Sequence, residues 1–343
     1  MSLLTIENLT THYHTAEGDV HAVDDVSLSL EQGETLGLVG ESGSGKTTLA
    51  RSINRVMDDN AEIIDGSIIF EGVDLTELSE SELRTYRWNE ISMIPQSAMN
   101  ALDPVYTIEH QIVEVIRAHE DETSAAEAKE RARELFELVG LEPGRVTDYP
   151  HQFSGGMRQR AMIAMALACD PKLVLADEPT TALDVIIQRQ ILNRIRELQD
   201  DMGISMIMVT HDISVVADTC DKIAVFYGGN LVEFADTESV ILEPNHPYTM
   251  GLRNAFPTIE TDDQTLISIP GQPPELTEPD DMCLFANRCP FAVEECFNHR
   301  PEFREIAPGQ HVHCHRAEEA PTLRKRATDR ETWYGEPEVS TDD

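Results

Sequence analysis

The stretch GESGSGKT at residues 40–47 lies between an apolar segment, TLGLV at 35–39, and a helical one, TTLARSINRVM at 47–57. A strand, a glycine-rich turn and a helix in this order are the context in which such a turn cradles phosphate. The glycines let backbone N–H groups approach the oxygens, Lys46 supplies a positive charge, and the Thr47 hydroxyl can hold Mg²⁺. A chance GKT in an ordinary turn is the alternative. The flanking strand and helix favour a phosphate-binding loop.

A pair of acids follows a second apolar run, KLVLADEPT at 172–180. Asp177 comes at the carboxyl end of the expected strand, where it can bind Mg²⁺ through water. Glu178, beside it, can orient and deprotonate an attacking water. Two adjacent acids could also be a solvated strand end, but a phosphate loop in the same chain favours catalysis.

A second anion site is indicated by FSGGMRQR at 153–160, where Ser154, Gly155 and Gly156 stand directly before a helical run. Exposed N–H groups and the helix dipole can receive an anion there. For an isolated SGG the alternative is a simple helix cap. One chain thus offers two phosphate-binding helix ends that are far apart in sequence.

The charge balance is strongly acidic, with 63 Asp and Glu against 26 Lys and Arg and a formal net charge of −37 in 343 residues. Only five of the basic residues are lysine, and the acids are spread along the whole chain. This composition is typical of proteins that work in concentrated salt, where ions screen acidic self-repulsion. A functional acidic face is the alternative. Nucleic-acid binding is disfavoured, because phosphate contacts need clustered Lys and Arg.

The sequence indicates a cytoplasmic protein. Its longest apolar run, AMIAMALAC at 161–169, is far shorter than the roughly 20 residues of a spanning helix. The start, MSLLTIENLT, has neither the basic nor the apolar region of a secretory signal. Thiols stay reduced in the cytoplasm, so disulfides among its six cysteines are not expected.

Three regions are expected along the chain. Residues 1–256 form an α/β domain, with short N-terminal strands, a helical part at about 98–168, and buried parallel strands around it. The Pro-rich stretch that follows marks a boundary, so residues 257–325 form a small C-terminal domain. Residues 326–343 carry little apolar surface and are expected to be a disordered tail.

One helix of the helical part is well defined by its sequence, SAAEAKERARELFELVG at 124–140. Ser124 is a suitable N-cap and Gly140 a suitable stop. The apolar positions that share one face of this helix are Ala128, Ala132, Leu135 and Val139.

The SGG segment between a phosphate loop and an Asp-Glu strand, followed by TTALD at 180–184 and VTHD at 209–212, resembles the ATP-binding cassette of ABC transporters. The resemblance extends over residues 3 to about 256. It implies a P-loop α/β ATPase with a parallel core sheet, an N-terminal antiparallel β subdomain and a helical signature subdomain.

The resemblance also implies individual roles. Tyr13 would stack on adenine, Gln96 would link Mg²⁺ to the helical subdomain, and His211 would contact the γ-phosphate. Taken alone, these could be a strand aromatic, a loop amide and a satisfied histidine. The residues implied to bind ATP are Tyr13, Gly40, Glu41, Ser42, Gly43, Ser44, Gly45, Lys46, Thr47, Thr48 and Gln96, and those implied to hold Mg²⁺ are Thr47, Gln96 and Asp177.

Two further elements would act across a dimer of cassettes. Ser154, Gly155 and Gly156 would bind the γ-phosphate of the opposite subunit, and residues 182–184, beginning at Ala182, would form the D-loop. Phe153 stands where the family usually has leucine, and Ser97 and Ala98 stand where an Asp-Pro pair usually follows the Q-loop glutamine.

HPYTMGL at 246–252 and IPGQPPEL at 269–276 are similar to the C-terminal extension of dipeptide and oligopeptide importer ATPases. The resemblance implies a heterodimer with a sibling ATPase on the cytoplasmic face of the membrane, beneath two permeases fed by an extracellular binding protein. Nickel or sugar import are alternatives. A soluble ABC protein of DNA repair or translation is disfavoured, because neither a long coiled coil nor a second cassette is present.

Four of the six cysteines cluster near the end of the chain, in CLFANRCPFAVEEC and HVHCH. Their number and the reducing compartment suit tetrahedral zinc or an iron-sulfur cluster, although no short CxxC pair is present. Four unligated thiols are the third possibility. The segment resembles the cysteine motif of the peptide-importer ATPases, which implies a [4Fe-4S] cluster, with zinc as the alternative. The implied ligands are Cys283, Cys289, Cys296 and Cys314.

Overall fold

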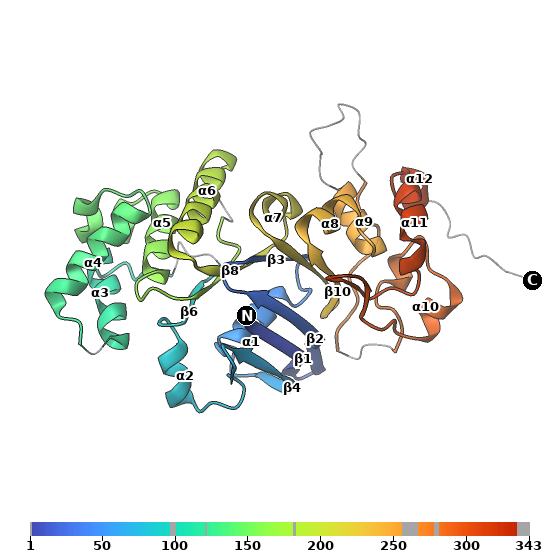
Figure 1. Cartoon of the computed structure of the whole chain (residues 1–343), viewed down its shortest axis with the longest axis horizontal. Helices are drawn as coiled ribbons and strands as arrows, with labels where there is room; N and C mark the ends of the chain where they lie inside the picture. Colours follow the sequence, from blue (N-terminus) through green and yellow to red (C-terminus); the bar gives the residue numbers. More distant parts are fainter. Residues whose placement is uncertain are drawn as a thin grey trace, which may run out of the picture.

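The computed structural model describes residues 2–96, 101–120, 122–180, 183–255, 267–277 and 281–334, and it is built around an eight-stranded sheet (Figure 1). The strand order is β11-β12-β10-β9-β3-β8-β7-β6. The strands are β3 (Thr35–Gly40), β6 (Ile91–Ile94), β7 (Leu173–Asp177), β8 (Ser205–Thr210), β9 (Lys222–Tyr227), β10 (Asn230–Asp236), β11 (Arg304–Ala307) and β12 (Gln310–Val312). The pairs from β6 to β9 are parallel, which confirms the expected parallel core.

The core strands are apolar on both faces because the sheet is covered on both sides. Along β8, Met206 and Met208 belong to one apolar cluster, and Ile207 and Val209 to the other. Strands buried on both faces have near-continuous apolar sequences, as SMIMV does here. Helix α6 (Val185–Met202) and helix α7 (Ile213–Thr219) contribute to the first cluster, and helix α1 (Lys46–Ile53) to the second.

A separate four-stranded antiparallel sheet, in the order β2-β1-β4-β5, confirms the N-terminal β subdomain. Its strands are β1 (Ser2–Thr15), β2 (Gly18–Glu31), β4 (Ala61–Phe70) and β5 (Val73–Asp74). Helix α1 contacts both this sheet and the core sheet. Helix α2 (Glu80–Tyr86) follows β5.

The helical part consists of α3 (Ile108–His119), α4 (Ala125–Leu138) and α5 (Gly155–Ala166), with α3 and α4 at one end of the molecule (Figure 1). Helix α4 begins and ends where the sequence predicts. Ser124 and Glu127 form a capping box, and Gly140 follows the helix with a positive φ of 71°. Within the described ranges, no helix combines the length and apolar character needed to cross a bilayer.

The C-terminal region is continuous with the cassette, so a separate small domain is not confirmed. Strand β12 pairs with β10 through Glu233 and Phe234, which makes this region an edge of the core sheet. Phe285 and Leu323 belong to the same apolar cluster as the helical part. The helices of this region are α8 (Thr237–Leu242), α9 (Pro247–Asn254), α10 (Glu294–Asn298), α11 (Ala320–Ala327) and α12 (Arg330–Tyr334).

The prediction of a disordered tail from residue 326 is wrong for residues 326–334. Helix α12 is ordered because one large aromatic anchors it. Trp333 is 4% exposed, and its Nε1 donates a hydrogen bond of 2.8 Å to the Ala327 carbonyl. A single buried Trp compensates for the low apolar content that suggested disorder. The remainder of the predicted tail, 335–343, lies outside the described residues.

Candidate nucleotide-binding site

The glycine-rich loop joins the carboxyl end of β3, in the core sheet, to the start of α1. A Cβ at Gly40 would lie 2.1 Å from the Phe226 carbonyl oxygen, and one at Gly45 would lie 2.0 Å from the Ala22 carbonyl oxygen. Both have positive φ, so only glycine fits at either position. No side chain of the described residues caps the first turn of α1. Its N–H groups are therefore available to an anion.

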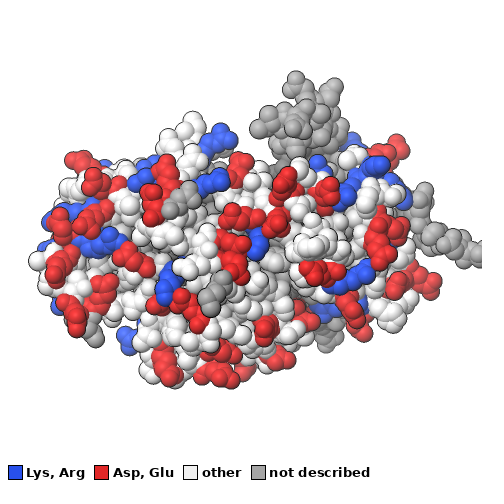
Figure 2. Space-filling view, viewed as in Figure 1, with Lys and Arg blue, Asp and Glu red and all other residues white. Residues whose placement is uncertain are grey.

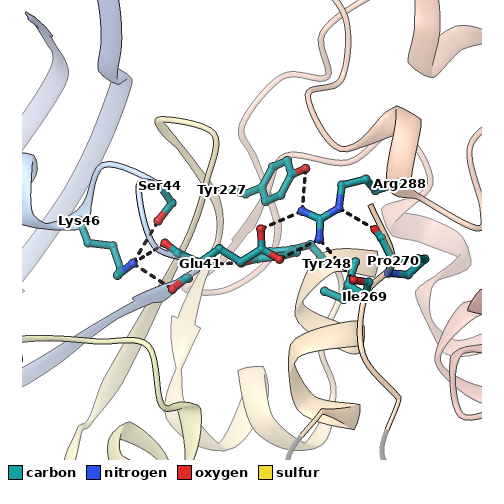
Figure 3. A network of polar contacts seen from close by, with 9 residues as sticks. Glu41, Ser44, Lys46, Tyr227, Tyr248, Ile269, Pro270 and Arg288 are labelled. Carbon is teal, nitrogen blue, oxygen red and sulfur yellow. Dashed lines mark hydrogen bonds and ion pairs between the residues drawn. The ribbon is translucent and has the colours of Figure 1, made fainter. Parts of the chain in front are cut away.

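Lys46 is folded into this loop. Its Nζ donates to the carbonyls of Gly40 (2.9 Å) and Glu41 (2.7 Å) and to the Ser44 hydroxyl (3.2 Å) (Figure 3). Burial lowers the pKa of Lys46 to about 8, against the opposing effect of the nearby acids Glu178, Asp177 and Glu41. Phosphate oxygens can replace the carbonyls as partners of this ammonium group and raise its pKa again.

Thr47 and Asp177 meet where the sequence predicts a magnesium site. The Thr47 hydroxyl donates a 3.1 Å hydrogen bond to Asp177 Oδ1, while Oδ2 is buried and has no hydrogen-bond partner among the described residues. Burial raises the pKa of the Asp177 carboxyl. A buried, unsatisfied carboxylate oxygen beside a hydroxyl is a donor set that Mg²⁺ prefers. The residues present therefore fit the ion.

Glu178 is held at the mouth of the site by residues from the ends of two further strands. Its Oε2 accepts a 3.2 Å hydrogen bond from Gln96 Nε2, and its Oε1 lies 3.1 Å from His211 Nδ1. Glu178 has a positive φ of 47°, a conformation rare for a side-chain-bearing residue, and its N–H donates to the Val209 carbonyl. The structure thus brings together Glu178, expected to activate water, His211, expected to contact the γ-phosphate, and Gln96, expected to link Mg²⁺ to the helical subdomain.

Tyr13 lies on β1, where its hydroxyl is 3.4 Å from the Thr48 hydroxyl of α1. The ring is half-buried and lies near the first turn of the helix that carries the phosphate loop. This position fits an aromatic residue beside the nucleotide, and the stacking on adenine stays a prediction.

The SGG segment forms part of a different surface. Ser154 is exposed and caps α5, and an open hollow of about 710 Å³ lies beside it. None of residues 40–47 lines this hollow, which suits a segment that binds nucleotide on another subunit. The residues lining the hollow include Ser154, Gly155, Gly156, Leu183, Asp184 and Ile187.

Phe153 is buried and packs edge-on against Phe136 at a centroid distance of 6.2 Å. The departure from leucine is therefore a matter of packing in the helical part. Ala182 of the predicted D-loop and the Ser97–Ala98 pair lie outside the described residues, whereas Asp184 caps α6.

Sequence reasoning missed a set of contacts to Glu41 that come from the C-terminal half of the chain. Arg288 pairs with both carboxylate oxygens of Glu41, and the Tyr248 hydroxyl accepts a hydrogen bond from its backbone N–H (Figure 3). Tyr248 lies within the HPYTMGL segment, which was the only signal in the sequence, and nothing local marked Arg288.

The four clustered cysteines lie together, and none forms a disulfide. The Cys283 N–H donates to the Cys296 carbonyl at 2.9 Å. Burial raises the pKa of the Cys289 thiol well above its usual value, and the thiols of Cys314, Cys283 and Cys296 raise it further. In the described part of the chain, no group of three or more His, Cys, Asp or Glu side chains could hold a metal ion. Cys169 and Cys220 are buried core residues, as predicted.

Comparison with known proteins identifies the family. A family model described as ABC transporter matches residues 23–181, and one described as Oligopeptide/dipeptide transporter, C-terminal region, matches 232–296. The dipeptide transport ATP-binding protein DppD of Lactococcus lactis subsp. cremoris is 46% identical over 89% of this chain and 88% of the relative. This chain belongs to the ATP-binding subunits of dipeptide and oligopeptide ABC transporters.

Other members of this transporter family and solved ABC cassettes agree with this assignment. The oligopeptide transport ATP-binding protein OppD of Escherichia coli K12 is 44% identical over 90% of this chain and 91% of its own length. The dimeric ATP-binding cassette MJ0796 bound to ADP and phosphate superimposes with a TM-score of 0.61 and 28% identity, over 68% of this chain and 98% of that one. The cassette cbiO1 of Clostridium perfringens gives a TM-score of 0.60 and 25% identity, over 74% and 95%. The fold is therefore that of an ABC ATPase cassette, as expected.

Proposed function

We propose that this chain hydrolyses ATP to drive the uptake of di- or oligopeptides through partner permeases. The convergence of Gln96, Glu178 and His211 beside the phosphate loop carries the hydrolytic part of the proposal. The peptide substrate is supported by the relatives, which are named for dipeptide and oligopeptide transport.

The residues divide the chemistry among them. Lys46 and the N–H groups at the start of α1 bind the phosphates, while Thr47 and Asp177 hold Mg²⁺, which supplies positive charge to the β- and γ-phosphate oxygens when bound. Glu178 orients the attacking water and accepts its proton. Gln96 and His211 fix the two carboxylate oxygens of Glu178, so the base is already oriented when the nucleotide arrives.

The second half of each site would come from another ATPase subunit. No residue of the chain's own phosphate loop lines the hollow at Ser154. Two cassettes arranged head to tail would bring each SGG segment to the other's γ-phosphate. We propose a heterodimer with a sibling ATPase, in which residues 182–184 form the D-loop contact between subunits.

The permease partners would dock beside the helical part. An open hollow of about 620 Å³ lies between β6, α3 and α5, lined by apolar side chains that include Trp88, Met162 and Met165. Tyr106, also on its rim, is an exposed aromatic. A hollow of this kind suits a short apolar helix of a membrane partner. The complex would then lie at the cytoplasmic face of the membrane and receive substrate from an extracellular binding protein.

Uptake by the reconstituted complex tests this proposal. The chain, its sibling ATPase, the two permeases and the binding protein are placed in proteoliposomes with ATP, and accumulation of labelled di- and oligopeptides is measured. ATP-dependent peptide accumulation is the expected result. Accumulation of nickel or a sugar instead would reassign the substrate. ATPase activity that copurifies with ribosomes or DNA and never with permeases would overturn the transport function.

We further propose a [4Fe-4S] cluster on Cys283, Cys289, Cys296 and Cys314 as a structural staple. The four thiols fit in number, burial and mutual proximity. Zinc on the same four cysteines is the alternative, with the sulfurs at about 2.3 Å from one ion. Anaerobic purification should give a brown protein with about four irons and four sulfides per chain. A colourless protein with one zinc would overturn the cluster, and a metal-free folded protein would overturn both.

We also propose that the protein is adapted to concentrated salt. Acidic side chains are distributed over the whole face seen in Figure 2, with fewer Lys and Arg among them. This distribution differs from a confined acidic patch that would bind one cationic partner. The formal net charge of −37 then favours folding only where ions screen the repulsion between carboxylates.

A further inference from the structure

The guanidinium group of Arg288, in the C-terminal region, binds the phosphate loop. Arg288 Nη1 donates to Glu41 Oε2 and Arg288 Nη2 to Glu41 Oε1, both at 2.8 Å (Figure 3). The Arg288 side chain is 6% exposed and that of Glu41 26% exposed. A two-point pair of this kind fixes orientation as well as distance. It joins residues that are 247 positions apart in the chain.

Arg288 also donates hydrogen bonds to groups outside the phosphate loop. Its Nε donates to the Pro270 carbonyl at 2.9 Å, and its Nη1 also donates to the Tyr227 hydroxyl at 3.2 Å. The guanidinium carbon lies 5.6 Å from the centre of the Tyr227 ring. Figure 3 shows these groups converging on one guanidinium from separate segments of the chain. The guanidinium group is therefore positioned by residues outside the phosphate loop as well as by Glu41.

The backbone N–H, the carbonyl and the carboxylate of Glu41 each have a hydrogen-bond partner within the protein. Its N–H donates to the Tyr248 hydroxyl at 2.9 Å, and its carbonyl accepts from Lys46 Nζ. Its carboxylate carries a negative charge within a loop that must attract an anion. Without a cation beside it, that charge would repel a triphosphate. Arg288 both neutralises the charge and fixes the loop in a conformation that is ready to bind.

We propose that Arg288 is a positioning residue for nucleotide binding, acting through Glu41 without touching the nucleotide. The inference rests on the proposed assignment of residues 40–47 as the phosphate loop. It also gives the C-terminal region a direct part in ATP binding. Arg288 ends a 3-10 turn, Ala286–Arg288, immediately before Cys289. A displacement of this turn would therefore weaken the ion pair between Arg288 and Glu41 of the loop.

The test is ATP affinity of the full chain with Arg288 replaced by Met. We expect Arg288→Met to weaken ATP binding by about tenfold or more, because a part-buried carboxylate loses its charged partner close to the phosphates. Arg288→Lys keeps the charge but makes only one of the two contacts, and should give an intermediate affinity. The double variant Glu41→Gln with Arg288→Met should recover only part of the affinity, since no unpaired charge remains but the loop has lost its two-point contact. A contact that serves folding alone would change the melting temperature of these variants and leave the ATP affinity of the folded chain unchanged.

Arg316→Met is the matched control. Arg316 also lies near a cysteine, pairs with a glutamate, Glu319, and donates to a backbone carbonyl, that of Phe291. Among the described residues, no hydrogen bond joins Arg316 to the phosphate loop. We expect this variant to bind ATP like the unmodified chain. Unchanged ATP affinity in folded Arg288→Met, or equal losses in both arginine variants, would overturn the inference. Lys46→Ala distinguishes a failure of the inference about Arg288 from a failure of the loop assignment. Normal ATP binding by that variant would overturn the loop assignment itself.

Discussion

The Tyr248 hydroxyl accepts a 2.9 Å hydrogen bond from the backbone N–H of Glu41, which ties helix α9 to the phosphate loop. Tyr248 is fully buried, and its ring lies 4.7 Å from that of Tyr227 and 5.5 Å from that of Phe285. The HPYTMGL segment is therefore in direct contact with the phosphate loop.

Tyr248→Phe should lower the free energy of unfolding by about 1–3 kcal/mol, because the Glu41 N–H loses its partner in a part-buried place while the ring packing is kept. Denaturant unfolding followed by fluorescence measures this. Tyr334→Phe is the control, since the Tyr334 hydroxyl bonds to Ser268 at the surface and its loss should change stability little. Equal stability of both variants would contradict the structural role of Tyr248.

Ser154→Arg should leave the ATP affinity of the isolated chain nearly intact and impair ATP-driven association of the two ATPase subunits. Arginine would fill the hollow beside α5, which the opposite nucleotide is expected to enter. Ser124→Arg is the control, because Ser124 is likewise an N-cap in the helical part but does not line the hollow. Sedimentation with MgATP measures association. Loss of ATP binding by isolated Ser154→Arg would contradict a site completed in trans.

ATP binding should weaken as the pH rises above about 8. Burial lowers the pKa of Lys46 from 10.5 to about 8, and bound phosphate would raise it again. Below pH 8 the ammonium group is charged before and after binding, so this group adds no pH dependence. Above pH 8 binding must take up a proton, and affinity falls by up to about tenfold per pH unit.

The lowered pKa of Lys46 affects the free energy of unfolding in the opposite direction, with stability rising as the pH rises. Between pH 8 and 10.5 the unfolded chain binds more protons at Lys46 than the folded chain does, so this group's contribution to the free energy of unfolding rises with pH there.

The proton uptake that accompanies ATP binding is measured by calorimetric titration with ATP at pH 7 and 9, in buffers of different ionisation enthalpy. Uptake at pH 9 only is expected, and identical heats in all buffers would contradict it.

Low salt should destabilise the isolated chain. The Debye length grows from about 3 Å at 1 M to about 30 Å at 0.01 M ionic strength, and the net charge of −37 then opposes the compact state. Melting temperature measured from molar to millimolar KCl should fall steeply as salt is removed. A melting temperature that does not depend on salt would remove the adaptation to concentrated salt.

The parts of the site that the sequence predicts well are those encoded by short contiguous segments. The phosphate loop, the acid pair at Asp177 and Glu178, and the helix that starts after Ser124 each depend on residues within a few positions of one another. Their geometry is set by local backbone conformation, such as the positive φ of Gly45 and the capping box of Ser124. Local sequence therefore carries most of the information.

The parts that it does not predict are pairings between distant segments. Glu233 is fully buried and accepts hydrogen bonds from the N–H groups of Asn245 and His246, an arrangement that no local pattern around Glu233 indicates. The pairing of β12 with β10 and the contact of Arg288 with Glu41 are of the same kind. Each depends on the path of the whole chain, so composition alone suggested a separate C-terminal domain where the structure has a sheet edge.

Peptide uptake by the reconstituted complex carrying Glu178→Gln tests whether ATP hydrolysis at this site drives import. The substitution removes the base but keeps the loop, Thr47 and Asp177, so ATP binding should persist while hydrolysis falls by about 10²- to 10⁴-fold. Peptide accumulation should fall with it, because transport is driven by turnover at this site. The complex carrying Glu178→Gln should bind ATP tightly and accumulate no peptide. Near-normal hydrolysis and uptake by the Glu178→Gln complex would contradict it.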